Sequence, residues 1–364
     1  MSEENLNQIL EESEQIPIVA LDLKAERKFC SGMGMNFFIF FLIANGLQLL
    51  VGGLILHLAP EMINDNYALY MILAMAPMYI IGVPVLWLLC KRREAVKLPQ
   101  NKIGTGNYMI FLFMCFGVMI AGNIVGIIVN LIIGLIKGSP VINSVDLMMN
   151  SSTLWANILI VGICAPIFEE LMFRKFIVDR MVRYGEATAI VVSGLMFGLF
   201  HGNFTQFFYA TALGILFAYI YVKTGKLRYT IFSHFIINMS STLMVPVLQK
   251  LDMEKLEQMS DTLELIIESG FSSDKAVALM TENMHQMVDM MVPLIILLVY
   301  EMVMYGMAFA GIVLLIARRK RFTCNPGQVT LPKGKRASVV WFNVGMILFT
   351  ISCLVLFVYT ILMV

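Results

Sequence analysis

Residues 165–176 read APIFEELMFRKF, a stretch that joins a strongly apolar run to a group of charges. The residues before Glu169 are almost entirely apolar, as far back as Leu154. Two acids follow, Glu169 and Glu170, and a cation, Arg174, comes four residues after the second. Charged side chains cost about 2.5–3.5 kcal/mol each at the centre of a membrane helix, so these three residues need an explanation.

The composition of the whole chain indicates a membrane protein. Of its 364 residues, 59% are hydrophobic and 14% are charged, whereas soluble domains are about half apolar and about a quarter charged. We predict an all-α fold, a polytopic helical transmembrane bundle. The net charge is +1, and no basic cluster is interleaved with aromatic residues, so no nucleic-acid partner is indicated. The six cysteines form no CxxC pair and are interpreted as small hydrophobic residues.

Apolar blocks close to the ~20 residues that cross a bilayer as a helix recur along the chain. We count about nine membrane helices, with a range of eight to nine. The predicted blocks are 35–58, 67–90, 107–136, 153–173, 187–201, 204–222, 229–248, 288–317 and 338–363.

The charges of the loops support this count. Lysine and arginine precede the first block and follow the second, fourth, sixth and eighth, while loop 59–66 has no cation and loop 137–152 has only Lys137. Positive residues favour the cytoplasmic side. We therefore expect an integral multi-pass protein, in the cell membrane if the source is bacterial, with its N-terminus in the cytoplasm and its C-terminus outside.

Five segments organise the chain. In residues 249–287, acidic residues alternate with Leu, Ile and Met at helical spacing, which predicts one amphipathic helix or a helical pair on the outer side. The predicted segments are a polar amphipathic N-terminal segment (1–30), three N-terminal transmembrane helices (31–149), a core of four transmembrane helices (150–248), an amphipathic helical loop (249–287) and two C-terminal transmembrane helices (288–364).

Ionisable residues inside apolar blocks are candidates for function by default. Adjacent residues of a helix point about 100° apart, so Glu169 and Glu170 cannot share one task. Glu170 and Arg174 are four apart and can pair. The structural alternative is an interfacial ion pair that ends a helix.

The fifth block contributes GLMFGLFHGNF, in which His201 follows Phe197 by one helical turn. Gly194, Gly198 and Gly202 recur every fourth residue and leave one face bare for close approach of another helix. The alternative to a functional histidine is a helix-packing face with a histidine at its end.

The seventh block contributes FSHFIINMSS, which places His234 and Asn238 four residues apart on one face. An interhelical hydrogen bond is the structural alternative. If the three helices pack together, the acids, the histidines and the amide converge. A glutamate beside a histidine can take a proton from water, and a second histidine with an amide can stabilise an oxyanion. This is the pattern of a hydrolase without a serine or cysteine nucleophile.

These residues resemble the CPBP family (CAAX protease and bacteriocin-processing, also called Abi), which includes the type II CAAX prenyl endopeptidases. Its three motifs are EExxxR, FxxxH and HxxxN or HxxxD. They match Glu169–Arg174, Phe197–His201 and His234–Asn238 in the same order. The resemblance covers roughly residues 150–245.

The resemblance implies an intramembrane endopeptidase whose substrate is a peptide or a membrane-tethered protein in the lipid bilayer. It implies that Glu169 and His201 activate water and that His234 and Asn238 hold the oxyanion. Supporting roles fall to Glu170, Arg174 and Phe197. It implies no metal, with a zinc site formed by Glu169, His201 and His234 as the alternative, although the chain has no HExxH helix.

Two other functions stay open. A non-enzymatic membrane protein, such as a bacteriocin immunity scaffold or a transporter, would use the polar cluster to bind an ion or join helices. A true CAAX protease would process prenylated proteins. If the fourth helix runs to about Tyr184 and the next starts near Gly185, Glu169 and His201 lie at similar depth. We expect access to the site from the cytoplasmic side.

Overall fold

The computed structural model describes residues 21–251, 253–270 and 273–363, and every regular element within those ranges is helical. This confirms the all-α prediction. Eight helices in the described part are long and apolar enough to cross a membrane. They are α2 (Leu23–Leu58), the α4–η1–α5 helix (Tyr67–Pro77, Met78–Gly82, Val83–Cys90), α6 (Thr105–Lys137), the continuous helix Leu154–Tyr184, α12 (Phe204–Thr224), α13 with α14 (Leu227–Thr242, Val245–Leu248), the Val288–Ala317 part of α16 (Asp274–Ala317), and α18 (Val344–Met363).

The predicted fifth block forms α11 (Glu186–Phe200), a helix of 15 residues. At 1.5 Å per residue it spans about 22 Å, less than the ~30 Å hydrocarbon core. The count of nine therefore resolves into eight candidate spans and one short apolar helix. The preceding helix runs on to Tyr184, as predicted, and the chain reverses at Gly185, whose φ of +104° is a conformation that suits glycine.

The predicted amphipathic loop differs from the structure at its C-terminal end. Its first half is α15 (Met253–Ser269), but its second half continues without a break into the membrane-length part of α16. The boundary drawn at residue 288 marks a change in hydropathy inside one helix. At the other terminus, residues 1–20 of the predicted N-terminal segment lie outside the described residues, and Leu23 already begins α2.

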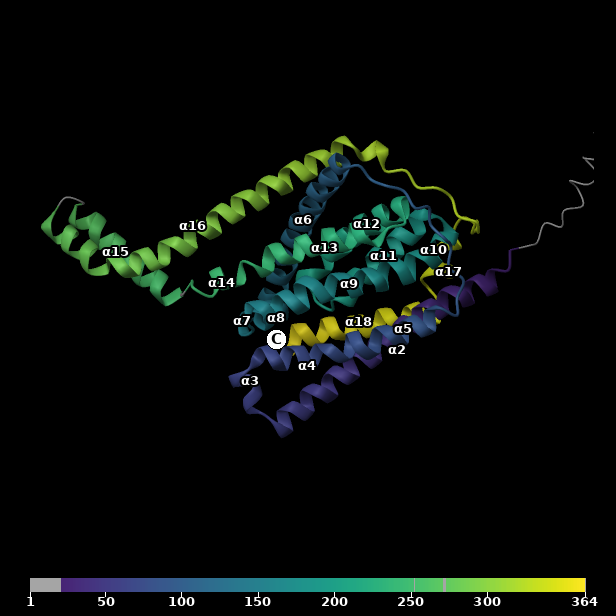
Figure 1. The fold of residues 1–364 in the computed structure, drawn as a ribbon, viewed down its shortest axis with the longest axis horizontal. Coiled ribbons are helices and arrows are strands. Elements are labelled where there is room, and N and C mark those ends of the chain that lie inside the picture. Colours follow the sequence, from purple (N-terminus) through teal and green to yellow (C-terminus); the bar gives the residue numbers. More distant parts are fainter. Residues whose placement is uncertain (1–20, 252, 271–272, 364) are drawn as a thin grey trace, which may run out of the picture.

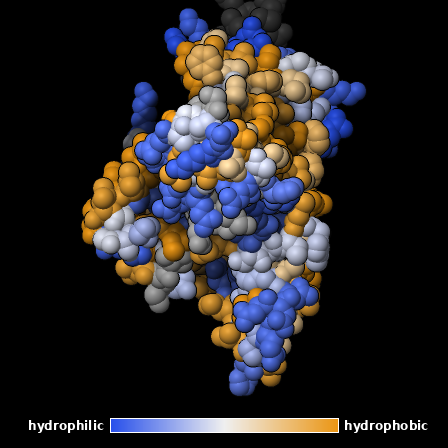
Figure 2. All heavy atoms as spheres, turned by 90° about the vertical axis from the view of Figure 1, so that its left-hand side faces the viewer, coloured by the Kyte–Doolittle hydropathy of each residue, from blue (hydrophilic) through white to orange (hydrophobic). Residues whose placement is uncertain are grey.

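Three groups of helices pack around the helix Leu154–Tyr184, which comes from the middle of the sequence (Figure 1). The helices α2, α4, α5 and α18 lie together on one side of the helix that contains α9 (Ala165–Glu170), with α11, α12 and α13 beside it. On the other side, α6 packs against α12 and α16. The far part of α16 and α15 project beyond the bundle. Figure 2 views the molecule from that projecting side and shows hydrophilic side chains gathered between hydrophobic ones.

Glycines allow these helices to approach closely. A Cβ added at Gly194 would lie 2.9 Å from the backbone nitrogen of Ile215, so α11 and α12 meet almost backbone to backbone. The same holds for α6 and α16 at Gly311, and for α2 and α18 at Gly345. The predicted bare face of α11 is thus used for packing, whereas Gly202, with φ +65°, lies against Leu356 of α18.

The basic loops meet at one end of the bundle. The loop after α5 bonds to α10 (Asp179–Met181) and to the last residue of α12. The loop after Arg321 bonds to the start of α11, and an ion pair joins α2 to η4 (Val182–Tyr184). The contacts are Val96 N to Asp179 O at 2.6 Å, Asn101 N to Thr224 O at 2.9 Å, Glu186 N to Asn325 O at 3.1 Å, and Arg183 Nη2 to Glu26 Oε1 at 3.2 Å. The alternation of loop charge in the sequence therefore corresponds to one positively charged end.

Candidate active site

The two acids lie on α9, between two π-helical segments, η2 (Ile158–Cys164) and η3 (Leu171–Val178). Pro166 in the first turn of α9 has no N–H to donate, which weakens the regular ladder at this point. Wide π turns are rare and occur often at functional sites. The helix is therefore irregular on both sides of the short α-helical segment that carries its carboxylates.

Glu169 and Glu170 diverge, as helical geometry requires. The side chain of Glu170 has no exposed surface, and its Oε2 lies 2.9 Å from Nε of Arg174, whose side chain is also fully buried. The predicted pairing of these two residues is confirmed. Glu169 points elsewhere and keeps 13% of its side-chain surface exposed. One acid is thus fully buried, and the other is partly exposed.

Two aromatic rings enclose the Arg174 guanidinium. Its central carbon lies 4.6 Å from the ring centre of Phe197 and 5.4 Å from that of Phe217. Such cation–π contacts stabilise a charge that has left water. A buried ion pair often costs as much in desolvation as it gains in attraction. The ion pair of Glu170 and Arg174 is therefore better explained by the side chains that it holds in position than by a gain in the stability of the fold.

His234, on α13, lies between both acids. Its Nδ1 is 3.1 Å from Oε1 of Glu170, and its Nε2 is 3.8 Å from Oε2 of Glu169. The first distance allows a hydrogen bond in which Nδ1–H donates to the carboxylate, and the second is too long for one. This fixes the ring so that Nε2 faces Glu169. The predicted proximity of Glu169 and His234 is therefore present.

His201 follows α11 directly, and its Nδ1 lies 2.8 Å from the carbonyl oxygen of Phe197. A carbonyl only accepts, so Nδ1–H donates and leaves the lone pair on Nε2. The Phe197 ring lies between the histidines, with ring centres 4.9 Å from His201 and 5.8 Å from His234. Glu169 and His234 are close enough to act on His201 electrostatically. The three motifs thus converge around Phe197.

Asn238 has a contact that the sequence did not indicate. Its Nδ2 donates to the carbonyl oxygen of Val161 at 2.8 Å, one helical turn along α13 from His234. Val161 belongs to η2, so the amide joins α13 to the π-helical segment before the acids. Part of the donor capacity expected for an oxyanion is already used within the fold.

Sequence reasoning missed two aromatic residues at the site. Phe217 of α12 lies 5.6 Å, between ring centres, from His234. Tyr79 of η1 stacks on Phe168, the neighbour of Glu169, with ring centres 4.7 Å apart. Phe217 sits in an apolar run with no distinguishing pattern. Tyr79 could have been noticed as a polar group within the apolar stretch MYIIG.

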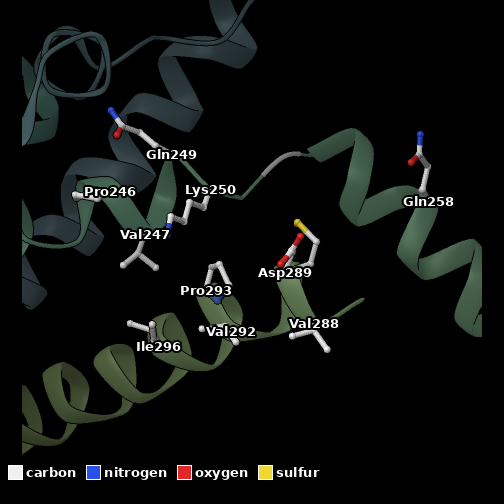
Figure 3. A pocket seen from close by; sticks show the side chains of 11 residues that line it. Pro246, Val247, Gln249, Lys250, Gln258, Val288, Asp289, Val292, Pro293 and Ile296 are labelled. Atoms are coloured by element: carbon white, nitrogen blue, oxygen red, sulfur yellow. The ribbon is translucent and has the colours of Figure 1, made fainter. Parts of the chain in front are cut away.

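The predicted site residues form no metal cluster within the described residues, and they lie outside the cavity beside α14 and α16. Within the described residues, no three His, Cys, Asp or Glu side chains are arranged to hold one metal ion. The zinc alternative with Glu169, His201 and His234 as ligands therefore does not fit this geometry. A cavity of about 930 Å³ lies between α14, the residues after it and α16, with Lys250 and Asp289 among its lining, and it contains none of the predicted site residues (Figure 3).

Comparison with known proteins agrees with the three motifs. A family model described as type II CAAX prenyl endopeptidase Rce1-like matches residues 151–240. The chain is also 32% identical over 111 residues to a protein of Bacillus subtilis (strain 168) named "Putative membrane peptidase YdiL", which covers 30% of this chain and 44% of that relative. The chain therefore matches less than half the length of that relative. No solved structure matches the chain significantly.

Proposed function

Because residues 151–240 form an Rce1-like domain of the type II CAAX prenyl endopeptidase family, we propose that the protein is an intramembrane endopeptidase. Its substrates are peptides or membrane-tethered proteins. The observation that carries the proposal is the approach of Glu169 to His234, with 3.8 Å between Oε2 and Nε2, beside the buried pair of Glu170 and Arg174. Glu169 is the acid that keeps exposed surface, so it is the one that can meet water and substrate.

In the proposed reaction, Glu169 takes a proton from a water molecule, and the water oxygen attacks the carbonyl carbon of the scissile bond. The carbonyl electrons move onto its oxygen. When they return, the carbon–nitrogen bond breaks, and the proton passes to the leaving nitrogen. His201 assists by accepting a hydrogen bond from the attacking water, since Nδ1–H donates to the Phe197 carbonyl and Nε2 carries the lone pair. Such proton transfer contributes about 10²- to 10⁴-fold to a rate.

Glu170 and Arg174 act on this reaction through His234. Their ion pair holds a full negative charge against Nδ1 of His234 and fixes the ring in one tautomer. The arrangement stabilises a positive charge on the ring if it gains a proton during the reaction. The family motifs imply that Asn238 donates to the oxyanion, and that His234 does so through Nε2 once its ring is protonated at both nitrogens. Glu170, Arg174 and Phe197 are positioning residues.

The proposal includes an orientation in the membrane. The end of the bundle where the basic loops meet lies in the cytoplasm, together with the N-terminus, because positive residues favour that side. The site opens toward the same side. In a bacterial source the membrane is the cell membrane.

A peptidase assay of Glu169→Gln tests the proposed function. The protein is reconstituted in proteoliposomes with a quenched fluorescent peptide that ends in a CAAX sequence, in farnesylated and unmodified forms. We expect wild-type cleavage and a loss of about 10²- to 10⁴-fold in the variant. The matched control is Glu301→Gln, which removes another acid from an apolar helix, outside the site, and should keep full activity.

Two outcomes would contradict the proposal. Cleavage by the Glu169 variant at the wild-type rate would remove the acid from the reaction. A wild-type protein that cleaves neither peptide would favour the non-enzymatic alternative, a scaffold or a transporter. Treatment with a zinc chelator should leave the rate unchanged, since the described residues do not form a zinc site.

A further inference from the structure

We propose that the hydroxyl of Tyr79 supplies the oxyanion-stabilising hydrogen bond in this site, an inference that rests on the proposed function. Tyr79 belongs to η1, in the N-terminal half of the chain, outside the matched residues 151–240. If this is correct, a catalytic group comes from a helix that the family motifs do not include.

Packing holds Tyr79 next to the acids. The residue is 7% exposed, and its ring stacks on Phe168 at an interplanar angle of 24°, with ring centres 4.7 Å apart. Phe168 directly precedes Glu169. The phenol of Tyr79 is also close enough to the Glu169 carboxylate to interact with it electrostatically. The hydroxyl therefore lies within electrostatic range of the carboxylate that meets water.

The hydroxyl of Tyr79 makes no hydrogen bond to any described residue, and it is not one of the fully buried side-chain atoms that lack a partner, so it keeps some exposed surface. Buried tyrosine hydroxyls usually have a partner, because an unpaired polar group costs free energy away from water. Other buried tyrosines of this protein follow that rule: Tyr221 donates to Asp179 at 2.9 Å, and Tyr184 donates to Glu26. The Tyr79 hydroxyl differs from these two in having no protein partner, and its exposed surface leaves it free to donate to a substrate oxygen beside the proposed catalytic acid.

The donors that the motifs imply are largely committed. The amide nitrogen of Asn238 already donates to Val161. His234 donates through Nδ1 to Glu170, so in the neutral ring its Nε2 carries a lone pair and cannot donate. A neutral phenol, by contrast, always has an O–H to give. As water adds to the carbonyl carbon, the carbonyl oxygen gains negative charge and accepts this hydrogen bond, with no proton transferred.

The test is Tyr79→Phe, which removes the hydroxyl and keeps the ring that stacks on Phe168. Loss of one oxyanion donor lowers kcat by about 10²- to 10³-fold in other hydrolases. We expect a loss of about 100-fold in kcat with KM unchanged, measured with the same farnesylated peptide. The control is Tyr70→Phe on the same helix, whose ring contacts Tyr67 and which should keep wild-type kcat.

Each outcome separates this inference from the proposed function. An active wild-type protein, an inactive Glu169→Gln variant and a fully active Tyr79→Phe variant would overturn the role of Tyr79 alone. A rise in KM with normal kcat would do the same, because it would indicate ground-state binding. If no form cleaves the peptide, both proposals fail. Should Tyr79→Phe not fold, Tyr79→3-fluorotyrosine replaces it: its more acidic phenol should raise kcat, and an unchanged kcat would contradict the inference.

Discussion

Nδ1 of His234 lies 3.1 Å from Oε1 of Glu170, a carboxylate without exposed surface that pairs through its other oxygen with Arg174. The order of these contacts explains the two adjacent acids. The buried acid holds a histidine in place, and that histidine faces the second acid, Glu169, across 3.8 Å. Two neighbours in the sequence thus take different places in one chain of contacts, because successive helical residues point in different directions.

Removal of either partner from the buried ion pair should destabilise the protein. Arg174→Met removes the cationic partner of the buried Glu170 carboxylate, and we expect a loss of about 3–5 kcal/mol in the free energy of unfolding. Glu170→Leu with Arg174→Met removes both charges and should restore most of that stability. The double variant should still be inactive, since His234 has lost its acceptor. The measurements are unfolding in detergent and cleavage of the fluorescent peptide.

The stability and the activity of the double variant together test this prediction. A double variant that is both stable and fully active would show that Glu170 is not needed to orient His234. A double variant less stable than Arg174→Met would contradict the electrostatic explanation.

Close packing of α11 against α12 predicts a large effect of one methyl group. A Cβ added at Gly198 would lie 1.9 Å from Oγ1 of Thr211 and 2.9 Å from the carbonyl oxygen of Phe207. Gly198→Ala should therefore cost about 1–3 kcal/mol, the range for overpacked cores, and should displace His201 at the end of α11. Its control is Gly53→Ala in α2, where nothing lies within 4 Å of the added Cβ. That control should be neutral or stabilise by about 0.5–1 kcal/mol. Equal stability of the two variants, measured by thermal unfolding, would refute the close approach.

Cys324 offers a native reporter of orientation. It is exposed in the loop after α16, whereas the other five cysteines are buried or half-buried. A membrane-impermeant maleimide should label it in inverted vesicles and not in right-side-out vesicles, and Cys324→Ser should abolish the signal. Desolvation and the nearby Glu186 carboxylate raise the pKa of the Cys324 thiol. Since the thiolate reacts, labelling should be slower than for a free thiol near pH 7 and should keep rising with pH beyond about 8.5. Labelling of right-side-out vesicles would reverse the proposed orientation.

Much of the fold followed from local patterns. Hydropathy located the long helices, and the position of Gly185 indicated where the fourth helix ends. Hydropathy placed a helix boundary at residue 288 that the structure does not have. The helix α16 continues through this position, although its residues change there from polar to apolar. It also counted α11 as a full span, since an apolar block of 15 residues is long enough to resemble one.

At the site, the sequence by itself determined the residue types and their helical spacing: an ion pair at i and i+4, a histidine one turn from a phenylalanine, and a histidine one turn from an asparagine. These are properties of a single helix. Only the tertiary structure decided which acid is buried, that Asn238 bonds to Val161, and that Tyr79, from another part of the chain, stacks on Phe168 beside Glu169. The physical reason is that burial and contacts between helices depend on how whole helices pack, and a chain more than half apolar offers many faces for that packing with little in the local pattern to distinguish them.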